Sequence, residues 1–510
     1  MKLLSDLYSG SLALLTDLYQ LTMSYGYWKS GKANQEAVFN LFFRENPFNG
    51  GYTVACGLEY AIDYIENFKF TQKDLQYLLE MKGNDGRPLF EPGFISFLEN
   101  MKFECDIDAV PEGTLVFPHE PMIRVRGPIC QCQLLETPLL NMLNFQTLIA
   151  TKASRIKASA KDDPVLEFGL RRAQGIDGAL AASRAAYIGG CDSTSNVLAG
   201  KLFDIPVSGT HAHSWVMSFE EEKEAFATYA KVMPNNVVLL VDTYDTIEGI
   251  KTAIEVGEEI KQRGEVFYGI RLDSGDLAYF STIARQMLDE AGFTETKIVA
   301  SNDLDEHLIA SLKNQEAKID IWGVGTKLVT AFDQPALGAV YKLSAIKNSA
   351  NEWDHKIKLS EQAIKINNPG IQQVKRFSRN GKFIGDMIYD ESLPAKNDYK
   401  MIDPSDATKR KSFNLGKEQG TDLLIPIFKK GAKVYNSPEI MEIKSYAAEQ
   451  MGNMDGSVKR FEFPHKYPVG LEESLFALKN NTIWWWQLRI GIQPTMAVLP
   501  RIIRKKYQES

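Results

Sequence analysis

The stretch VVLLVDTYDTIEGIKTAIEVGEEIKQRGEVFYGIRLDSGD, residues 237–276, contains two β-rich apolar runs separated by a helical segment. The runs, VVLLV and VFYGI, each end in a polar turn, DTYDT or RLDSGD. Residues 246–263 have the apolar spacing of an amphipathic helix, which Thr246 can cap and Gly264 can end. This order predicts two parallel strands joined by a crossover helix.

The same pattern extends outward over residues 164–345, and a second clear helical segment lies at 277–291. Continuous β-rich runs are typical of a parallel sheet that is buried on both faces. Seven such units favour an irregular, closed or nearly closed α/β barrel of the TIM type, whose loops after the strands open on one face. The runs and their turns are VLEF with GLRRAQG, AYI with GGCDSTSN, PVS with GTHAHS, VVLLV with DTYDT, VFYGI with RLDSGD, KIVA with SNDLD, and IDIW with GVGT.

The two flanks differ from this central pattern. Residues 1–140 mix helical segments with short β-like pieces, and residues 346–510 are charged, with turns such as INNPG and SRNGKF. We therefore expect an α/β barrel core at 141–345 and a mixed α+β domain that the N-terminal and C-terminal segments form together.

Composition sets limits on the class of protein. A chain of 510 residues, 44% hydrophobic and 24% charged, predicts a globular protein of two or three packed units. The net charge of −7 argues against a surface devoted to nucleic acid or to an anionic membrane. Five cysteines without a CxxC pair fit a reducing compartment. The opening MKLLSDLYSG does not resemble a secretory signal, and no apolar run approaches the roughly 18 residues of a spanning helix, so we expect a cytoplasmic protein.

Polar residues with chemical potential follow the β-rich runs. In any one place such a residue is as readily a helix cap or an ordinary loop residue. Together, on the face where barrel enzymes build their sites, they predict an active site. The residues are Arg171, Asp192, His213, Asp242, Arg271, Asp273, Asp303 and Thr326.

GVGT, from Gly323 to Thr326, follows the run IDIW. Glycines let backbone N–H groups approach an anion closely, and late barrel loops commonly bind phosphate. Gly323 and Gly325 are equally compatible with a tight turn, but their position favours a phosphate site.

RLDSGD, from Arg271 to Asp276, offers one cation and two carboxylates on a short turn. Arg271 can make a bidentate contact with a carboxylate or phosphate. Asp273 and Asp276 can hold ribose hydroxyls or Mg²⁺, the cation that accompanies diphosphates. Asp303 occupies a similar loop position, which favours function over an ion pair within the turn.

EFGLRRAQG places Phe168 at a strand end beside Arg171 and Arg172. An aromatic face with a guanidinium suits a flat anionic heterocycle. The alternative is that Phe168 packs in the core and the arginines are solvated.

GTHAHSW contains His211 and His213, which point to opposite sides if the segment is extended. This spacing, without a third ligand nearby, argues against zinc. A structural loop histidine, a general acid or base, and a nucleophile that accepts a phosphoryl group all remain open.

Taken together, these residues resemble the nicotinate phosphoribosyltransferase family, a branch of the type II phosphoribosyltransferases. The similar stretches are LLTDLYQLTMSYGYW (14–28), EFGLRRAQGIDGALAASRAAYIGGCDSTSNVLAGK (167–201), PVSGTHAHSW (206–215), GIRLDSGD (269–276), GVGTKLVTAFDQPALGAVYKL (323–343) and KLSEQAIKINNPG (358–370). The resemblance implies an irregular α/β barrel and a homodimer with active sites at the subunit interface. It implies formation of nicotinate mononucleotide and diphosphate from nicotinate and phosphoribosyl diphosphate, in NAD synthesis. ATP hydrolysis coupled through a phosphohistidine, and a requirement for Mg²⁺, are implied as well.

The resemblance also implies roles for individual residues. His213 matches the phosphorylated histidine, and Asp273 resembles a residue of the same catalytic centre. The positions that match or resemble nicotinate contacts are Tyr19 (from the partner subunit), Phe168, Arg171, Thr210 and Arg271. Those expected at phosphoribosyl diphosphate are Asp192, Asp303, Gly323, Gly325 and Thr326.

One segment departs from the family pattern. From about Asn480 the chain reads NNTIWWWQLRIGIQPTMAVLPRIIRKKYQES, with adjacent tryptophans and a basic end. We expect it to pack on the C-terminal segment, and an interface is the alternative.

Other functions stay open at this stage. A nicotinamide phosphoribosyltransferase would lack the substrate anion that Arg271 can meet, and a quinolinate enzyme would need a second carboxylate-binding cluster. A binding protein that kept the barrel but lost catalysis would be expected to lack Arg271, Asp273, His213 or Thr326, and all of these are present.

Overall fold

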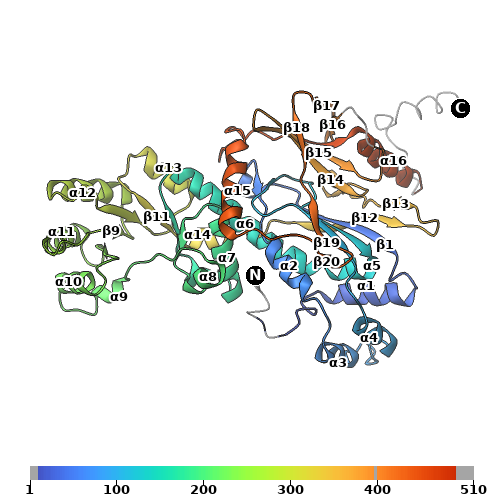
Figure 1. Ribbon diagram of the computed structural model, residues 1–510, viewed down its shortest axis with the longest axis horizontal. Coiled ribbons are helices and arrows are strands. Elements are labelled where there is room, and N and C mark those ends of the chain that lie inside the picture. Colours follow the sequence, from blue (N-terminus) through green and yellow to red (C-terminus); the bar gives the residue numbers. More distant parts are fainter. Residues whose placement is uncertain (1–7, 9, 395–398, 490–510) are drawn as a thin grey trace. The chain divides into compact units, whose positions relative to one another are not determined.

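The structure is a computed structural model that describes residue 8, residues 10–394 and residues 399–489 (Figure 1). These residues form two compact units, each considered by itself. The first comprises the described residues up to Thr147, residues 336–438 and those from Glu449 onward. The second comprises residues 148–335 and 439–448.

The second unit is built on a six-stranded parallel sheet with the order β7-β6-β11-β10-β9-β8. Apolar strand residues such as Ile270, Ile298 and Trp322 are fully buried, as the continuous apolar runs predict. The strands are β6 (Val165–Glu167), β7 (Ser193–Thr194), β8 (Val238–Leu240), β9 (Gly269–Leu272), β10 (Lys297–Ala300) and β11 (Ile321–Val324).

Helices follow most of these strands and include the crossover between β8 and β9. That crossover helix, α11 (Thr246–Gln262), is capped by Asp245 rather than Thr246, since the Asp245 carboxylate accepts from the Glu248 N–H at 2.9 Å. Gly264, with a φ of 75°, ends it in the left-handed region. The other helices are α7 (Ile176–Ile188), α8 (Val197–Phe203), α9 (His213–Val216), α10 (Glu222–Val232), α12 (Leu277–Glu290), α13 (Glu306–Asn314) and α14 (Thr326–Val329), with the 3₁₀ turn η2 (Leu170–Arg172).

Two details differ from the pattern predicted by the sequence. The run AYI is the end of α7, so the strand of that unit, β7, lies beyond the glycine turn instead of before it. Asp192 therefore precedes a strand. Val207 of the run PVS makes only a single bridge to Thr194, and no strand ladder joins β8 to β7 in the part of the chain described. A parallel α/β sheet is thus present, and the closed barrel remains a prediction.

The first unit contains two large, mainly antiparallel sheets. One has the order β13-β12-β1-β5-β3-β19-β20 and the other β17-β16-β21-β15-β14-β18. The strands of the first sheet are β1 (Glu36–Phe42), β3 (Asp106–Ala109), β5 (Ile123–Pro128), β12 (Val340–Lys347), β13 (Trp353–His355), β19 (Ile425–Lys429) and β20 (Ala432–Lys433). Those of the second are β14 (Gln372–Arg379), β15 (Lys382–Asp390), β16 (Tyr399–Asp403), β17 (Asp406–Phe413), β18 (Gln419–Asp422) and β21 (Val469–Glu472), and a small pair is formed by β2 (Thr53–Val54) and β4 (Leu115–Val116).

Four helices of the first unit cluster around an aromatic core in which Tyr25 contacts Trp28, Phe90 and Phe94. They are α1 (Leu18–Lys29), α3 (Gln72–Glu80), α4 (Pro92–Glu99) and α5 (Ile129–Leu134). The unit also contains α2 (Leu58–Glu66), α16 (Glu473–Arg489) and the short turns η1 (Pro47–Asn49) and η3 (Ala363–Lys365). Two further helices, α6 (Glu136–Ala160) and α15 (Ile440–Asn453), each contribute residues to both units.

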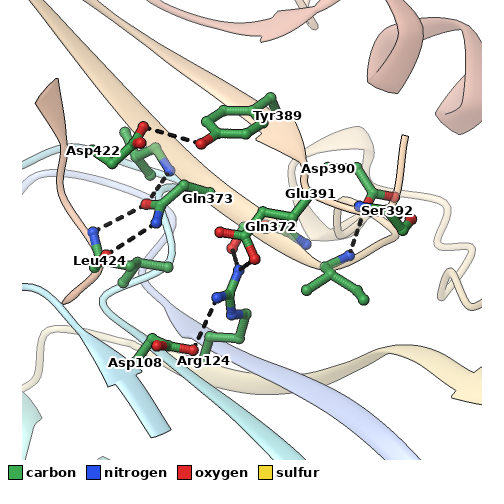
Figure 2. A network of polar contacts seen from close by, with 12 residues as sticks. Asp108, Arg124, Gln372, Gln373, Tyr389, Asp390, Glu391, Ser392, Asp422 and Leu424 are labelled. Atoms are coloured by element: carbon green, nitrogen blue, oxygen red, sulfur yellow. Dashed lines mark hydrogen bonds and ion pairs between the residues drawn. The ribbon is translucent and has the colours of Figure 1, made fainter. Parts of the chain in front are cut away.

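A buried polar network joins the two large sheets of the first unit (Figure 2). Arg124 on β5 pairs with Asp108 on β3 at 2.9 Å and with Glu391, just after β15, at 2.8 Å. The same guanidinium donates to the carbonyl of Gln372 on β14 at 2.8 Å. The Gln373 side chain bonds both backbone groups of Leu424, so the sheets are linked by directional contacts as well as by apolar packing.

Helix α16 includes the start of the Trp-rich tail. Trp485 and Trp486 meet edge to face at 4.9 Å, and the Arg489 guanidinium lies 5.0 Å from the Trp485 ring. The rest of the predicted tail, residues 490–510, lies outside the described residues. None of the helices described combines the length and apolar character needed to cross a membrane.

Candidate active site

A pocket of about 470 Å³ opens at the carboxyl ends of the parallel strands in the second unit. Its lining comes from the ends of β6, β9, β10 and β11, the turns that follow them, and the loops around β7 and before α9. The lining residues are Phe168, Leu170, Arg171, Arg172, Ser195, Gly209, Thr210, His211, Ala212, Arg271, Asp273, Ser301, Asn302, Asp303, Gly323, Gly325 and Thr326.

Phe168 forms one wall of the pocket. Its N–H donates to the Val324 carbonyl at 2.7 Å, which fixes it beside β11. A Cβ on Gly323 would lie only 2.8 Å from the Phe168 ring, so glycine is needed for the ring to pack against the strand. The buried Glu167 holds the turn behind the ring, since its carboxylate accepts from Ser183 at 2.8 Å and also from the Gly169 N–H.

Arg271 lines the pocket and has one unsatisfied donor. Its Nη1 donates to the Thr210 hydroxyl at 2.5 Å, while its buried Nε has no hydrogen-bond partner among the residues described. Burial lowers the pKa of the Arg271 guanidinium, and the nearby carboxylates of Asp273 and Asp242 oppose that shift. A buried donor without a partner is costly, so an anionic ligand here would gain free energy by satisfying it.

Asp273 is fixed in place from two neighbouring loops. Its N–H donates to Asp242 Oδ2 at 2.8 Å, and its Oδ1 accepts from the Ser301 hydroxyl. Asp242 also accepts from Ser274 at 2.7 Å, while its buried Oδ1 has no partner in the described part of the chain. The loops after β8, β9 and β10 are thereby locked together around one carboxylate.

His213 is the first residue of α9 and lies beside the pocket. Its Nδ1 is 3.1 Å from the Thr243 hydroxyl, and its Nε2 is 3.7 Å from Asp273 Oδ2. The side chain is 38% exposed, which leaves the ring open to a ligand.

His211 has a structural role. Its buried ring accepts from the Leu240 N–H through Nε2 at 3.2 Å and contacts Tyr229 edge to face at 4.7 Å. Nδ1 therefore carries the proton, directed toward the Ala212 carbonyl. Burial lowers the pKa of His211 to about 4, so the ring is neutral at physiological pH and anchors the loop to β8.

The GVGT segment ends β11 and begins the short helix α14. Lys327 pairs with Asp305 at 2.6 Å, and Asp305 caps α13 by accepting from the Leu308 N–H at 2.8 Å. This contact joins the turn after β11 to the turn after β10. Gly325 and Thr326 are held at the rim of the pocket as a result.

The structure brings together nearly all the site residues expected from the sequence. Two lie elsewhere. Asp192 accepts from the Val165 N–H at 2.9 Å and pairs with Lys157 at 3.1 Å, at the amino end of β6, and does not line the pocket. Tyr19 belongs to α1 of the first unit and is 47% exposed.

Some lining residues were not expected. Ser301 and Asn302 directly follow the run KIVA, and this position was the only signal that could have indicated them. Asn302 has a φ of 115°, a backbone conformation that a non-glycine residue rarely adopts, at the turn that carries Asp303.

Models of known protein families match most of this chain. Models described as the nicotinate phosphoribosyltransferase N-terminal domain, the nicotinate phosphoribosyltransferase family and the nicotinate phosphoribosyltransferase C-terminal domain match residues 14–144, 165–376 and 371–479. The chain belongs to the nicotinate phosphoribosyltransferase family. The resemblance inferred from the motifs is confirmed.

Individual members of the nicotinate phosphoribosyltransferase family are similar over nearly their whole length. The Bacillus subtilis enzyme is 48% identical, over 93% of this chain and 95% of its own. The human enzyme is 33% identical, over 92% of this chain and 96% of its own. A crystal structure of human nicotinic acid phosphoribosyltransferase aligns with a TM-score of 0.79 at 30% identity, over 91% of this chain and 99% of that chain. A nicotinate-nucleotide pyrophosphorylase from Pyrococcus furiosus, at 22% identity and a TM-score of 0.65, shares the fold.

Proposed function

We propose that this chain joins nicotinate to the phosphoribosyl group of phosphoribosyl diphosphate and releases diphosphate, a step of NAD biosynthesis. The observation that carries this assignment is the buried, unpartnered Nε of Arg271 in a pocket walled by Phe168. A pyridine ring can stack on Phe168 while its carboxylate satisfies Arg271 and Thr210. The neutral amide of nicotinamide would bring no negative charge to pair with the guanidinium.

The transfer makes a bond from the pyridine nitrogen to the anomeric carbon and breaks the bond from that carbon to diphosphate. Positive charge builds on the ribose as the diphosphate leaves, so carboxylates near the sugar and donors at the phosphates stabilise the transition state. Asp273 and Asp303 are assigned to the ribose side, and Gly323, Gly325 and Thr326 to the phosphates. Arg171, in the turn that follows Phe168, supplies positive charge to the same pocket. Asp192 is left out because lysines already pair with it.

His213 is assigned as the residue that couples ATP to the reaction. When His213 Nδ1–H donates to Thr243, Nε2 carries the lone pair. Nε2 then attacks the γ-phosphoryl group of ATP, and ADP leaves. Water later hydrolyses the phosphohistidine and releases phosphate. A phosphoryl group adds roughly −1.5 to −2 charges. It would arise beside Asp273, which three loops hold, and would attract the arginines that line the pocket and so order the loops that carry them.

Magnesium fits this site as a partner of the substrate phosphates. In the described residues no group of three or more acidic, histidine or cysteine side chains could hold a metal by itself. Mg²⁺ commonly takes one or two carboxylates, with phosphates and water completing its shell. Asp273 and Asp242, whose Oδ1 has no partner, would supply those carboxylates, and the metal would neutralise charge on the leaving diphosphate. Asp276 is not assigned to the metal, because its side chain caps α12.

The assembly proposed is a cytoplasmic homodimer in which Tyr19 of one subunit completes the partner's nicotinate site. Tyr19 lies at the start of α1, where Leu18 is 49% exposed and Leu15, just before the helix, is 44% exposed. Exposed apolar residues grouped in this way are typical of a protein interface.

The test is diphosphate release with nicotinate, nicotinamide or quinolinate, each with and without ATP. We expect nicotinate to be used and ATP to stimulate the reaction. Preference for nicotinamide or quinolinate would overturn the substrate assignment, and ligand binding without diphosphate release would indicate an inactive binding protein. His213→Asn should abolish ATP stimulation and labelling from γ-labelled ATP. Label retained on that variant would remove His213 from the coupling step.

A further inference from the structure

The first unit holds a second pocket, of about 530 Å³, which the proposed reaction does not use. A volume of this size is ordinary for a small-molecule site. Its floor is formed by Phe117, stacked on the buried Tyr467 with ring centroids 4.1 Å apart. Ile366, Ile388 and Leu471 add further apolar surface.

Basic side chains converge on this apolar space. His119, in its wall, has its pKa lowered to about 4 by burial first, and then by the positive charges of Lys479, Arg44 and Lys466. All four side chains line the pocket. Such a positive field is notable in a chain whose net charge is −7.

The carboxylates in the lining do not neutralise the deeper cations. Asp403 pairs with Lys466 at 3.6 Å and accepts from the Ser405 hydroxyl at 2.6 Å. Glu45 is exposed. Arg44 Nε is buried and has no hydrogen-bond partner in the described part of the chain.

Lys479 marks the point where an anion would bind. Its ammonium donates to Oδ1 of the buried Asn368 at 2.9 Å, and within the described residues it forms no ion pair. Burial lowers the pKa of Lys479 to about 8, a shift that no neighbouring carboxylate counteracts. An ammonium held this way, with neutral partners only, gains free energy from a ligand that brings a negative charge.

We propose that this pocket binds an organic carboxylate, whose anion pairs with Lys479 and whose apolar body packs on Phe117, Ile388 and Leu471. One charged end and a hydrophobic remainder match a site that joins an ammonium without an ion-pair partner to a largely apolar wall. The inference is independent of the proposed function, because every residue that it uses lies in the first unit.

The experiment is isothermal titration of the full chain with octanoate as the probe, and with 1-octanol and octylamine as uncharged and cationic controls. Octanoate should bind and both controls should bind at least tenfold more weakly, because they lack the anion. Lys479→Met keeps the length of the side chain and should weaken octanoate binding by about tenfold. Lys466→Met, at a side chain that is 79% exposed, makes the same change where solvent screens the charge, and should alter binding less than twofold.

Proton uptake gives a second measurement that does not depend on a variant. Burial lowers the pKa of Lys479 to about 8, and pairing with an anion should raise it again, so octanoate binding near pH 8 should take up protons, measured from the dependence of the heat on buffer ionisation. Arg271→Lys, altered in the other unit, should bind octanoate as the wild type does. Undetectable octanoate binding, equal binding of octylamine, unchanged affinity in Lys479→Met, or loss of binding in Arg271→Lys would each overturn the proposal.

Discussion

At the residue scale, recognition of the substrate depends on the shape of the Arg271 guanidinium. Lysine at this position keeps the charge but loses Nε and the planar pair of donors that faces a carboxylate. We expect Arg271→Lys to raise the KM for nicotinate about 30-fold, the order of one charge-assisted hydrogen bond, with a smaller change in kcat. Steady-state kinetics measures this, with Arg263→Lys, on the exposed end of α11, as the matched control. A KM that changes less than threefold would contradict the assigned contact.

The buried neutral histidine His211 makes stability depend on pH. Its pKa is about 4 in the folded protein, below the ordinary value near 6.5, so the unfolded chain binds more protons between these values. Stability should therefore fall as pH falls from 6.5 toward 4, by about 1 kcal/mol per pH unit from this group. Denaturant unfolding at pH 7, 6 and 5 should show a shallower dependence in His211→Gln than in the wild type. Equal slopes would mean that the ring does not stay neutral.

Single positions of the site were predictable because the ends of parallel strands converge. Arg271, Asp273 and Thr326 all follow apolar runs, and the structure does bring them into one pocket. The prediction for Asp192 was wrong because the apolar run before it is the end of α7 and not a strand. The glycine turn therefore precedes a strand, and Asp192 lies at the strand's amino end. That Arg271 Nε lacks a hydrogen-bond partner could not be predicted from the sequence, because it depends on which side chains reach the guanidinium in the folded protein.

At the scale of elements, the sheets of the first unit depend on the network around Arg124 (Figure 2). Replacing this buried side chain leaves Glu391 and the Gln372 carbonyl without their partner, and breaking a buried ion pair costs roughly 3–5 kcal/mol. Asp108 keeps Lys429 at 3.2 Å, so we expect Arg124→Met to cost about 3 kcal/mol in the free energy of unfolding.

The control for this change lies two residues along the same strand. Arg126 pairs with Glu36 at 2.6 Å, but its side chain is 39% exposed, so Arg126→Met should cost less than about 1 kcal/mol. Denaturant unfolding of both variants, followed by circular dichroism, compares them. Similar losses in the two would show that the buried network does not stabilise the sheets more than an exposed pair does.

The strands and helices of the second unit could be predicted from the sequence more readily than those of the first. Its strands are continuous apolar runs with capped helices between them, and both signals are local. In the first unit, β1 pairs with β12 and β3 pairs with β19, partners about 300 residues apart, which no local pattern indicates.

At the scale of the whole molecule, the first unit is discontinuous in sequence, because residues 148–335 and 439–448 belong to the second unit. Even α15 contributes to both units, and Lys444 on that helix reaches the Cys191 carbonyl at 2.7 Å inside the second unit. Nothing in the charged sequence of residues 439–448 indicates this role. The family relationship was easier to predict than the units, since it depends on motifs and not on long-range packing.

The shared site of the proposed dimer leads to a prediction about mixed subunits. Tyr19 lies in the first unit and Arg271 in the second. If Tyr19 serves the partner's site, a heterodimer of Tyr19→Ala and Arg271→Ala subunits has one site with both changes and one with neither.

Random mixing makes half of the dimers mixed, and each mixed dimer has one intact site of its two. Activity should therefore recover to about a quarter of the wild-type value. Mixing Arg271→Ala with His213→Asn places both changes in the second unit, where each site of the mixed dimer keeps one defect, and no ATP-stimulated activity should return. Diphosphate release after co-expression decides between the arrangements, because a Tyr19 that serves its own subunit would give no recovery in either mixture.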